Sequence, residues 1–229
     1  GTDGLAYLCS QQGYGEVLAT RQSMNRQTGT TASTFKGLYE AYSGSDVRRQ
    51  FIALGNRNSI GGETNVPLAL KYVNIVNYQE NLKILRFSEM YLSRAEALGR
   101  LALQNSDPAA LANSVADLTL LRNRRDTATI SRPLNVTFSG TPPSGSITLP
   151  AYLDSVILER RREFALEGQR LFDLNRTKTN YVKISTAGSA TSRLIDYNAA
   201  PTSFYNRTIL PIPNGELAVN TKLIQNPGF

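Results

Sequence analysis

The sequence predicts a mainly α-helical protein, built from tetratricopeptide-like helical hairpins joined by long irregular loops, with little β-structure. Two observations support this prediction. Apolar residues recur at helical spacing in three stretches after residue 83. Before and between those stretches the chain is polar and rich in glycine, proline and serine, as is typical of loops. We therefore expect residues 1–70 to form an irregular, loop-rich segment and residues 71–229 to form a helical domain.

The first 70 residues offer only short candidate elements. Residues 34–42 could form either a helix or a strand. A short helix is expected over residues 46–54, where Asp46 suits the position at its start. β-branched and aromatic residues between Pro67 and Tyr78 favour an extended segment. So long an irregular stretch is uncommon inside a compact domain unless it is functional or packs against something else.

The first predicted hairpin begins near residue 84. Small residues at Ala95, Ala97 and Gly99 would permit the close approach of a neighbouring helix. After a short turn, Asp107 provides an N-cap and Pro108 suits the first position of the next helix. The buried stripe of the first helix is expected to contain Ile84, Phe87, Tyr91, Leu98 and Ala102, broadened by Leu85 and Leu92.

The second helix of this hairpin shows apolar residues at spacings of four and three, namely Leu111, Val115 and Leu118. It ends in the basic run RNRR. Residues 127–150 then contain repeated proline, glycine and serine, which predicts a loop.

A third helix is expected from about Pro150, with Leu153, Ile157 and Phe164 on its buried side. Gly168 supplies the left-handed residue that commonly ends a helix. A short helix to Arg176 would complete a second hairpin. Near the end of the chain, residues 215–219 form a further possible short helix.

Charged residues crowd the second corner, from Leu158 to Arg176. Glu159, Glu163 and Glu167 are four residues apart and would share one face of a helix. Because burying a lone charge is expensive, these groups must pair or stay in water. We expect a structural ion-pair network that also reaches the first hairpin. Its predicted members are Arg86, Glu89, Glu96, Glu159, Arg160, Glu163, Glu167, Arg170 and Asp173.

The same carboxylates allow another interpretation, the acid and base of a glycoside hydrolase. Such enzymes hold two carboxyl groups roughly 5–10 Å apart and keep one of them protonated. Residues four apart on a helix meet that distance. The neighbouring arginines, Arg160, Arg161, Arg162 and Arg170, would instead hold the carboxylates ionised. We therefore expect no catalytic residue, and the hydrolase is the less favoured alternative.

Composition excludes several classes of function. The chain has no histidine, which removes His-dependent triads and His-ligated metal sites. A single cysteine excludes an internal disulfide and a cysteine zinc cluster. No metal or other cofactor is expected. The net charge of +7 permits nucleic-acid binding, but the arginines are interleaved with acidic residues, so no nucleic-acid partner is expected.

Three motifs, in this order along the chain, resemble the SusD/RagB family. They are KILRFSEMYLSRAEAL at residues 83–98, LERRREFALEGQRLFDLNR at 158–176 and ILPIPNGELAVNTKLIQNPGF at 209–229. The resemblance covers residues 71–229 and extends more loosely to DVRR at 46–49. It implies a SusD-like fold in which the N-terminal half carries further tetratricopeptide hairpins. Because family members are considerably longer, we expect this chain to be a C-terminal portion.

The resemblance also implies a function. Family members are outer-membrane lipoproteins on the extracellular face of the cell that bind nutrients, usually glycans. The implied role is non-enzymatic: the protein captures an oligosaccharide and partners a SusC-like TonB-dependent transporter. The alternative from a different class is a helical scaffold that binds a protein or peptide in a concave groove.

Membrane attachment is expected only through a lipid anchor that is absent from this chain. The sequence has no apolar run long enough to span a bilayer. Gly1 opens a segment without a basic start and a following apolar stretch, so no signal peptide is expected. Cys9 is not expected to carry a lipid, because Leu8 stands where a small residue is needed.

Glycan recognition requires aromatic platforms for sugar faces and planar polar groups for hydroxyls. Tryptophan is absent, so the best candidates are tyrosines in loops: Tyr14, Tyr39, Tyr42, Tyr181, Tyr197 and Tyr205. The resemblance places the glycan site largely on N-terminal elements and variable loops, with some contribution from the segment before the AEA helix. It therefore implies Tyr39, Tyr42 and Arg57 as substrate-binding residues.

Overall fold

The computed structural model describes residues 38–57, 63–69, 71, 85–130, 134–138, 141–179, 181–184, 192–195, 212–220 and 222–225. The chain divides into two compact units, Gly1–Glu167 and Gly168–Phe229. Cys9, Tyr14, Tyr197 and Tyr205 lie outside the described residues. The predicted boundary at residue 70 stays a prediction.

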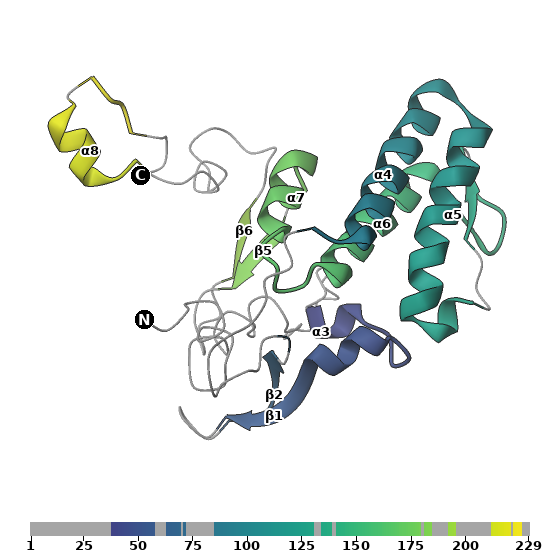
Figure 1. The fold of residues 1–229 in the computed structure, drawn as a ribbon, viewed down its shortest axis with the longest axis horizontal. Helices are drawn as coiled ribbons and strands as arrows, with labels where there is room; N and C mark the ends of the chain where they lie inside the picture. The colour runs from purple at the N-terminus through teal and green to yellow at the C-terminus, as the bar shows by residue number, and fades with distance from the viewer. Residues whose placement is uncertain are drawn as a thin grey trace. The chain divides into compact units, whose positions relative to one another are not determined.

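Three long helices dominate the first unit and account for about half of its described residues (Figure 1). They are α4 (Phe87–Asn105), α5 (Pro108–Arg125) and α6 (Leu149–Glu163). α4 and α5 form a hairpin, and α6 packs against α4. The prediction of a mainly helical fold built from helical hairpins is confirmed.

The ends of these helices follow the capping rules. The Asp107 carboxylate accepts hydrogen bonds from the backbone N–H groups of Ala109 (2.8 Å) and Ala110 (3.1 Å), and Pro108 opens α5 as predicted. Between α4 and α5, Ser106 adopts a left-handed conformation. Thr148 caps α6 by accepting from the N–H of Ala151.

The apolar core lies where the three helices meet. On α4 the expected Leu92, Ala95, Gly99 and Ala102 are buried, whereas the expected Phe87 is 86% exposed. Small residues let the neighbouring helices come close, and Phe87 stands at the first turn, outside the contact. On α6 the stripe is shifted by one residue, to Leu149, Tyr152 and Val156, with Leu153 and Ile157 half-buried, while Phe164 just after the helix is buried as predicted.

Two buried hydroxyl groups join the helices inside this core. Ser114 on α5 donates to the carbonyl of Ala95 on α4. Its oxygen also lies 2.7 Å from the hydroxyl of Tyr152 on α6. Burial raises the pKa of Tyr152 to about 12, so its hydroxyl stays neutral at physiological pH. The hydrogen bonds give polar groups in an apolar site the partners they need.

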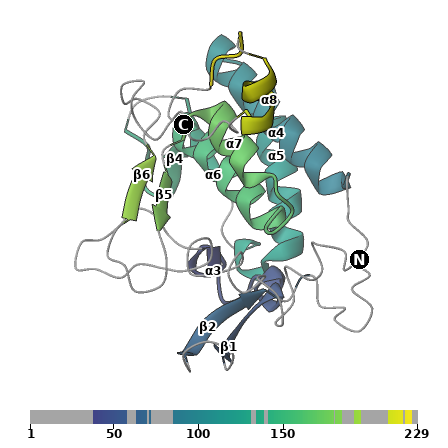
Figure 2. The same ribbon diagram turned by 90° about the vertical axis from the view of Figure 1, so that its left-hand side faces the viewer.

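The elements before α4 are short. α3 (Leu38–Ala41) is followed by a 3₁₀ helix, η1 (Val47–Phe51), and by strand β1 (Ile52–Arg57), which pairs antiparallel with β2 (Glu63–Ala69). The helix predicted over residues 46–54 is therefore wrong for Ile52–Leu54, which belong to the strand. Figures 1 and 2 both show α3 and the β1–β2 hairpin at the same end of the first unit.

The predicted loop at residues 127–150 contains regular structure that the sequence did not indicate. After a short 3₁₀ helix, η2 (Thr127–Thr129), β3 (Asn135–Thr137) pairs in parallel with β4 (Ser146–Thr148). Leu134, Val136 and Phe138 pack against the helical core. Three-residue strands carry too little pattern to be recognised beside so many proline and glycine residues.

The second unit contains two helices and a pair of antiparallel strands. They are α7 (Arg170–Thr177), β5 (Tyr181–Ile184) paired with β6 (Ser192–Ile195), and α8 (Asn214–Val219). The predicted short helix near the chain end is confirmed. Before α8, the backbone of Ile212 exchanges two hydrogen bonds with the side-chain amide of Gln225, of 2.8 and 3.0 Å.

Candidate functional site

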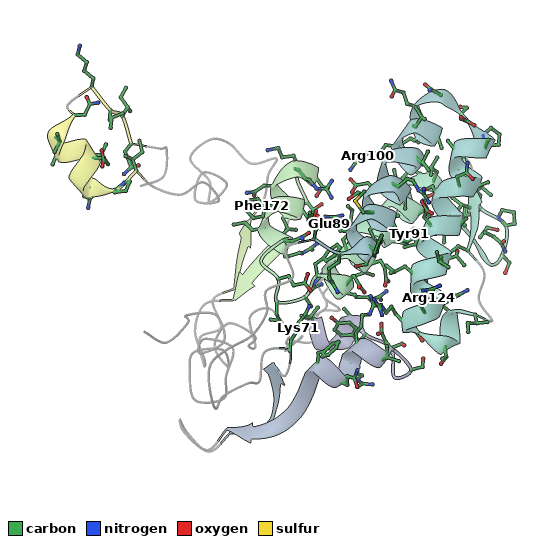
Figure 3. All side chains as sticks on the ribbon, in the orientation of Figure 1. Lys71, Glu89, Tyr91, Arg100, Arg124 and Phe172 are labelled. Carbon is green, nitrogen blue, oxygen red and sulfur yellow. The ribbon has the colours of Figure 1, made fainter. Side chains whose placement is uncertain are left out.

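A cluster of buried and half-buried charges surrounds the C-terminal end of α6, and we call it the charged corner. It draws on η1, α5, α6 and the segments next to them. The labelled Lys71 in Figure 3 marks one of its edges. Its members are Asp46, Arg48, Lys71, Arg86, Arg125, Glu159, Arg162, Glu163 and Glu167.

Glu163 is the hub of the charged corner, with a side chain only 1% exposed. Its Oε2 accepts from Arg48 Nη1 at 2.9 Å, and Arg125 donates to both of its carboxylate oxygens at 3.0 and 3.2 Å. Arg86 Nη1 lies 3.3 Å from Oε1. Burial alone would raise the pKa of Glu163, but the hydrogen bonds and charge of Arg125 and the charges of the other two arginines outweigh it. The pKa of Glu163 therefore lies below its ordinary value.

Arg48 ties the segment before β1 to α6. Its Nε and Nη2 donate to Asp46 at 2.9 and 2.7 Å. Nη2 also forms an ion pair with Glu159, at 2.7 Å from its Oε1. Burial disfavours the charge, but the hydrogen bond to Asp46 and the charge of Glu159 raise the pKa of Arg48 above its ordinary value. Arg162 donates to the other oxygen of Glu159 at 3.1 Å.

Glu167 forms the outer part of the corner. Lys71 donates to its Oε1 and, at 2.8 Å, to the carbonyl of Ala165. Arg86 Nη2 lies 3.0 Å from the same Oε1, and its guanidinium stacks 5.2 Å from the centre of the Phe164 ring. Burial lowers the pKa of Lys71, although Glu167 acts in the opposite direction. The prediction that Glu159, Glu163 and Glu167 share one helix is wrong, because α6 ends at Glu163 and Glu167 lies beyond it.

The remaining residues of the predicted network lie in several places. On α4 the buried Glu96 pairs with the exposed Arg100 at 2.9 Å, and Arg160 donates to Ser93 at 3.3 Å. Arg86 pairs with the end of α6 and not with Glu89, for which no ion pair is found in the described part of the chain. In the second unit, Arg170 and Asp173 lie on α7, and Asp173 pairs with Arg176 at 2.7 Å.

The structure corrects one of the three expected ligand contacts. Tyr42 is only 6% exposed, and its hydroxyl donates to the carbonyl of Arg162 at 2.8 Å. Burial raises the pKa of this hydroxyl above its ordinary value. A ring buried in this way offers no face to a sugar, so Tyr42 is part of the scaffold. Tyr39 lies in α3 and Arg57 ends β1, and the side chains of both lie outside the described residues.

Sequence reasoning missed several partners in the charged corner. Arg125 appeared only as part of a basic run, and Lys71 gave no signal at all. Arg48 and Asp46 belong to the DVRR run, in which the sequence predicted a helix start at Asp46 and a loose likeness to a family but no ion pair. Because Arg48 and Glu163 are 115 positions apart, no local spacing could join them.

A groove of about 1000 Å³ opens on the other face of α5, between this helix and β3. We call it the α5 groove. Arg124, which is labelled on the lower part of α5 in Figure 3, is its one charged lining residue among those described. The α5 groove is lined by Pro108, Leu111, Ala112, Val115, Ala116, Thr119, Leu120, Asn123, Arg124, Leu134, Asn135, Val136, Thr137, Phe138 and Ser146.

Two features are absent from the described residues. No group of three or more acidic or cysteine side chains is arranged there to hold a metal ion. No helix in that part of the chain combines the length and the apolar character needed to cross a membrane.

Comparison with known proteins gives matches over the part of the chain that contains the three motifs. The sequence profile of the SusD family matches residues 68–229. A crystal structure of a SusD superfamily protein from Bacteroides vulgatus is 25% identical, with a TM-score of 0.55 over 81% of this chain and 36% of that one. No curated protein matches the chain.

Two further crystal structures are more distant. A SusD-like carbohydrate binding protein from Bacteroides vulgatus is 17% identical, with a TM-score of 0.45 over 69% of this chain and 31% of that one. A SusD-like protein from Bacteroides fragilis is 21% identical, with a TM-score of 0.43 over 74% and 32%. The chain thus spans about a third of the length of these solved proteins. Because the family profile matches more than half of its residues, this chain belongs to the SusD family.

Proposed function

We propose that the protein of which this chain is part captures an oligosaccharide or similar nutrient at the extracellular face of the outer membrane. In this role it partners a SusC-like TonB-dependent transporter and catalyses no reaction. The observation that carries the proposal is membership of the SusD family over residues 68–229. Within the protein, the described helices serve as scaffold.

The charged corner supports a non-enzymatic role. A retaining or inverting glycosidase needs one carboxyl group that stays protonated near neutral pH. Glu163 has a lowered pKa and is surrounded by three arginines, so it stays ionised. Glu159 is held by Arg48 and Arg162. Neither carboxylate suits a general acid.

The test of glycan capture is binding by the full-length protein. We expect saturable binding to at least one polysaccharide class on a glycan array, checked by calorimetry, with no turnover of chromogenic glycosides. Turnover that disappears in the Glu163→Gln variant would contradict the proposal and support the hydrolase. Absence of binding across the array would also count against it.

The transporter partnership has its own test. We expect a large β-barrel protein to co-purify with the full-length protein from membranes in mild detergent. Glycan binding without any such partner would retain the capture function and remove the partnership.

A second candidate function is a helical scaffold that binds a protein or peptide. One specific observation favours it: the α5 groove is open, largely apolar and lined by both a helix and a strand. It requires no glycan, so the two functions can be tested separately.

A further inference from the structure

The strand wall of the α5 groove is a strand edge. All five residues from Leu134 to Phe138 line the groove, whereas β4 contributes only Ser146. Leu134, Val136 and Phe138 pack on the core, so their neighbours along the strand face the opposite way. A sheet face would show alternate residues of both strands. Consecutive residues of a single strand indicate its edge.

This edge of β3 carries no strand partner in the part of the chain that the structure describes. β4 pairs with β3 in parallel, from Asn135 with Ser146 to Thr137 with Thr148, and so occupies one edge only. An open edge leaves backbone N–H and C=O groups free to pair with another extended segment. Natural proteins usually cover such an edge or use it for binding.

The helix wall of the α5 groove has small and apolar side chains against which the side chains of a ligand can pack. Ala112 and Ala116 lie one turn apart on α5 and leave room, while Leu111 and Val115 provide apolar surface beside them. An extended chain on β3 would point alternate side chains toward this wall and the rest away from it. Small or apolar residues at every second position would fit.

The groove has charge at one end only. Arg124 is exposed and has no ion pair among the described residues. Its neighbour Arg125 is already engaged with Glu163, and acidic side chains are absent from the described lining. A carboxylate on the ligand would provide the missing partner for Arg124.

We propose that the α5 groove binds an extended peptide segment that adds to β3 as a further strand. The segment carries small apolar residues at alternate positions and an acidic residue or terminal carboxylate beside Arg124. This inference develops the scaffold function and does not depend on glycan capture.

The test uses the chain as it stands and labelled synthetic peptides. Each peptide has six residues of alternating valine and threonine, followed or preceded by one aspartate, and both ends are blocked. Matched peptides carry lysine in place of aspartate, or methyl groups on alternate backbone nitrogens. Binding is followed by fluorescence anisotropy, and the exchange of the β3 amide protons is measured with and without peptide.

We expect at least one aspartate peptide to bind and to slow amide exchange in β3. Arg124→Glu should weaken that binding about five- to tenfold and improve binding of the lysine peptide, because it reverses one exposed ion pair. Backbone methylation should abolish binding, because it removes the ladder hydrogen bonds. The matched control is Lys222→Glu, which makes the same change of charge at an exposed residue outside the groove lining.

Three results would overturn the proposal. The first is no binding of either aspartate peptide up to about 1 mM, the weak end of specific affinities. The second is equal binding of the methylated peptide, and the third is an unchanged affinity in Arg124→Glu. Glycan binding by the full-length Arg124→Glu protein is measured in parallel. If it persists while peptide binding fails, the scaffold function fails alone.

Discussion

The two halves of α6 are packed by different interactions, apolar contacts in the first half and ion pairs in the second. In its first half Leu149, Tyr152 and Val156 are buried in the apolar core. In its second half Glu159 and Glu163 occupy the same face and are buried equally well. The stripe thus continues at helical spacing while its chemistry changes from apolar to ionic.

The difference lies in what each half needs from the rest of the chain. The apolar half gains by leaving water, and any apolar neighbour of suitable shape serves it. The ionic half gains little overall, because desolvation offsets the attraction between charges. It is costly to break, however, since removing one partner leaves the others buried and unpaired. It therefore demands particular partners, such as Arg48 and Arg125.

The largest expected effect is the loss of the hub of the charged corner. Glu163→Ala removes the carboxylate that faces Arg48, Arg86 and Arg125 and leaves three guanidinium groups crowded together. We expect the free energy of unfolding to fall by about 3–5 kcal/mol. Urea unfolding followed by circular dichroism would measure it. The control is Glu216→Ala at an exposed position of α8, which should change stability far less. A loss below about 1 kcal/mol for Glu163→Ala would mean that the corner is not critical.

Acidification should weaken the same corner without a mutation. A carboxylate whose pKa is lowered in the folded state adds stability above its unfolded pKa of about 4.3. That stability is lost as pH falls below this value and through the lower folded pKa of Glu163. The effect should be smaller than that of Glu163→Ala, because the protonated carboxyl keeps its shape.

The measurement is the urea midpoint as a function of pH, for the unmodified chain and for Glu163→Gln. The variant should show a shallower fall below pH 4.3, because its amide does not titrate. The pKa of Asp126 is also lowered, because hydrogen bonds from Ser43 and Ser45 outweigh the effect of burial. Asp126 should therefore cause part of the fall in stability in both proteins. Identical slopes for the two proteins would exclude Glu163 as a source of the pH dependence.

The comparison also explains how far the sequence could predict this molecule. Features set by neighbouring residues were predictable: Asp107 and Pro108 mark the start of α5. Gly168 is left-handed with φ of 79° as expected, but it does not end the helix, because α6 stops five residues earlier, at Glu163. The hairpin itself follows from the helical period. The buried face followed only in part: Gly99 lies at the helix contact as expected, but Phe87, placed on the buried stripe because it is hydrophobic, is exposed.

For the charged corner, the sequence could predict that ion pairs form but not which residues form them. The density of charges between residues 158 and 176 shows that pairing is needed, because buried charges require partners. It does not show which partners, since Arg48 and Lys71 come from segments about a hundred residues away. Arg86 was expected in the network but its partner could not be predicted, because Arg86 precedes the first residue of α4 and reaches the end of α6.

Adding a methyl group at Gly99 of α4 tests the packing against the apolar half of α6. Whether the free energy of unfolding rises or falls shows how tightly the two helices fit. An added Cβ would lie 2.8 Å from Leu153 Cδ2, 3.2 Å from Ser114 Oγ and 3.3 Å from Tyr152 Cε1. Helix propensity alone would make Gly99→Ala stabilising by about 0.5–1 kcal/mol. Overpacking costs about 1–3 kcal/mol, so we expect a net loss of about 1 kcal/mol in urea unfolding. Gly215→Ala in α8 is the matched control, because nothing lies within 4 Å of its Cβ and no loss is expected. A gain at Gly99 would show that Leu153 moves aside.

The smallest effect should come from an ion pair outside the corner. Arg100 pairs with Glu96 one turn earlier on α4 at 2.9 Å, but its side chain is 54% exposed, so water and salt screen the attraction. Arg100→Gln keeps most of the aliphatic stem and should reduce the free energy of unfolding by about 0.3–0.5 kcal/mol. Repeating the urea titration in about 1 M sodium chloride, where the Debye length is near 3 Å, should remove the difference. A loss comparable to that of Glu163→Ala would contradict the contrast between the two regions, because a pair with one exposed partner would then matter as much as a fully buried one.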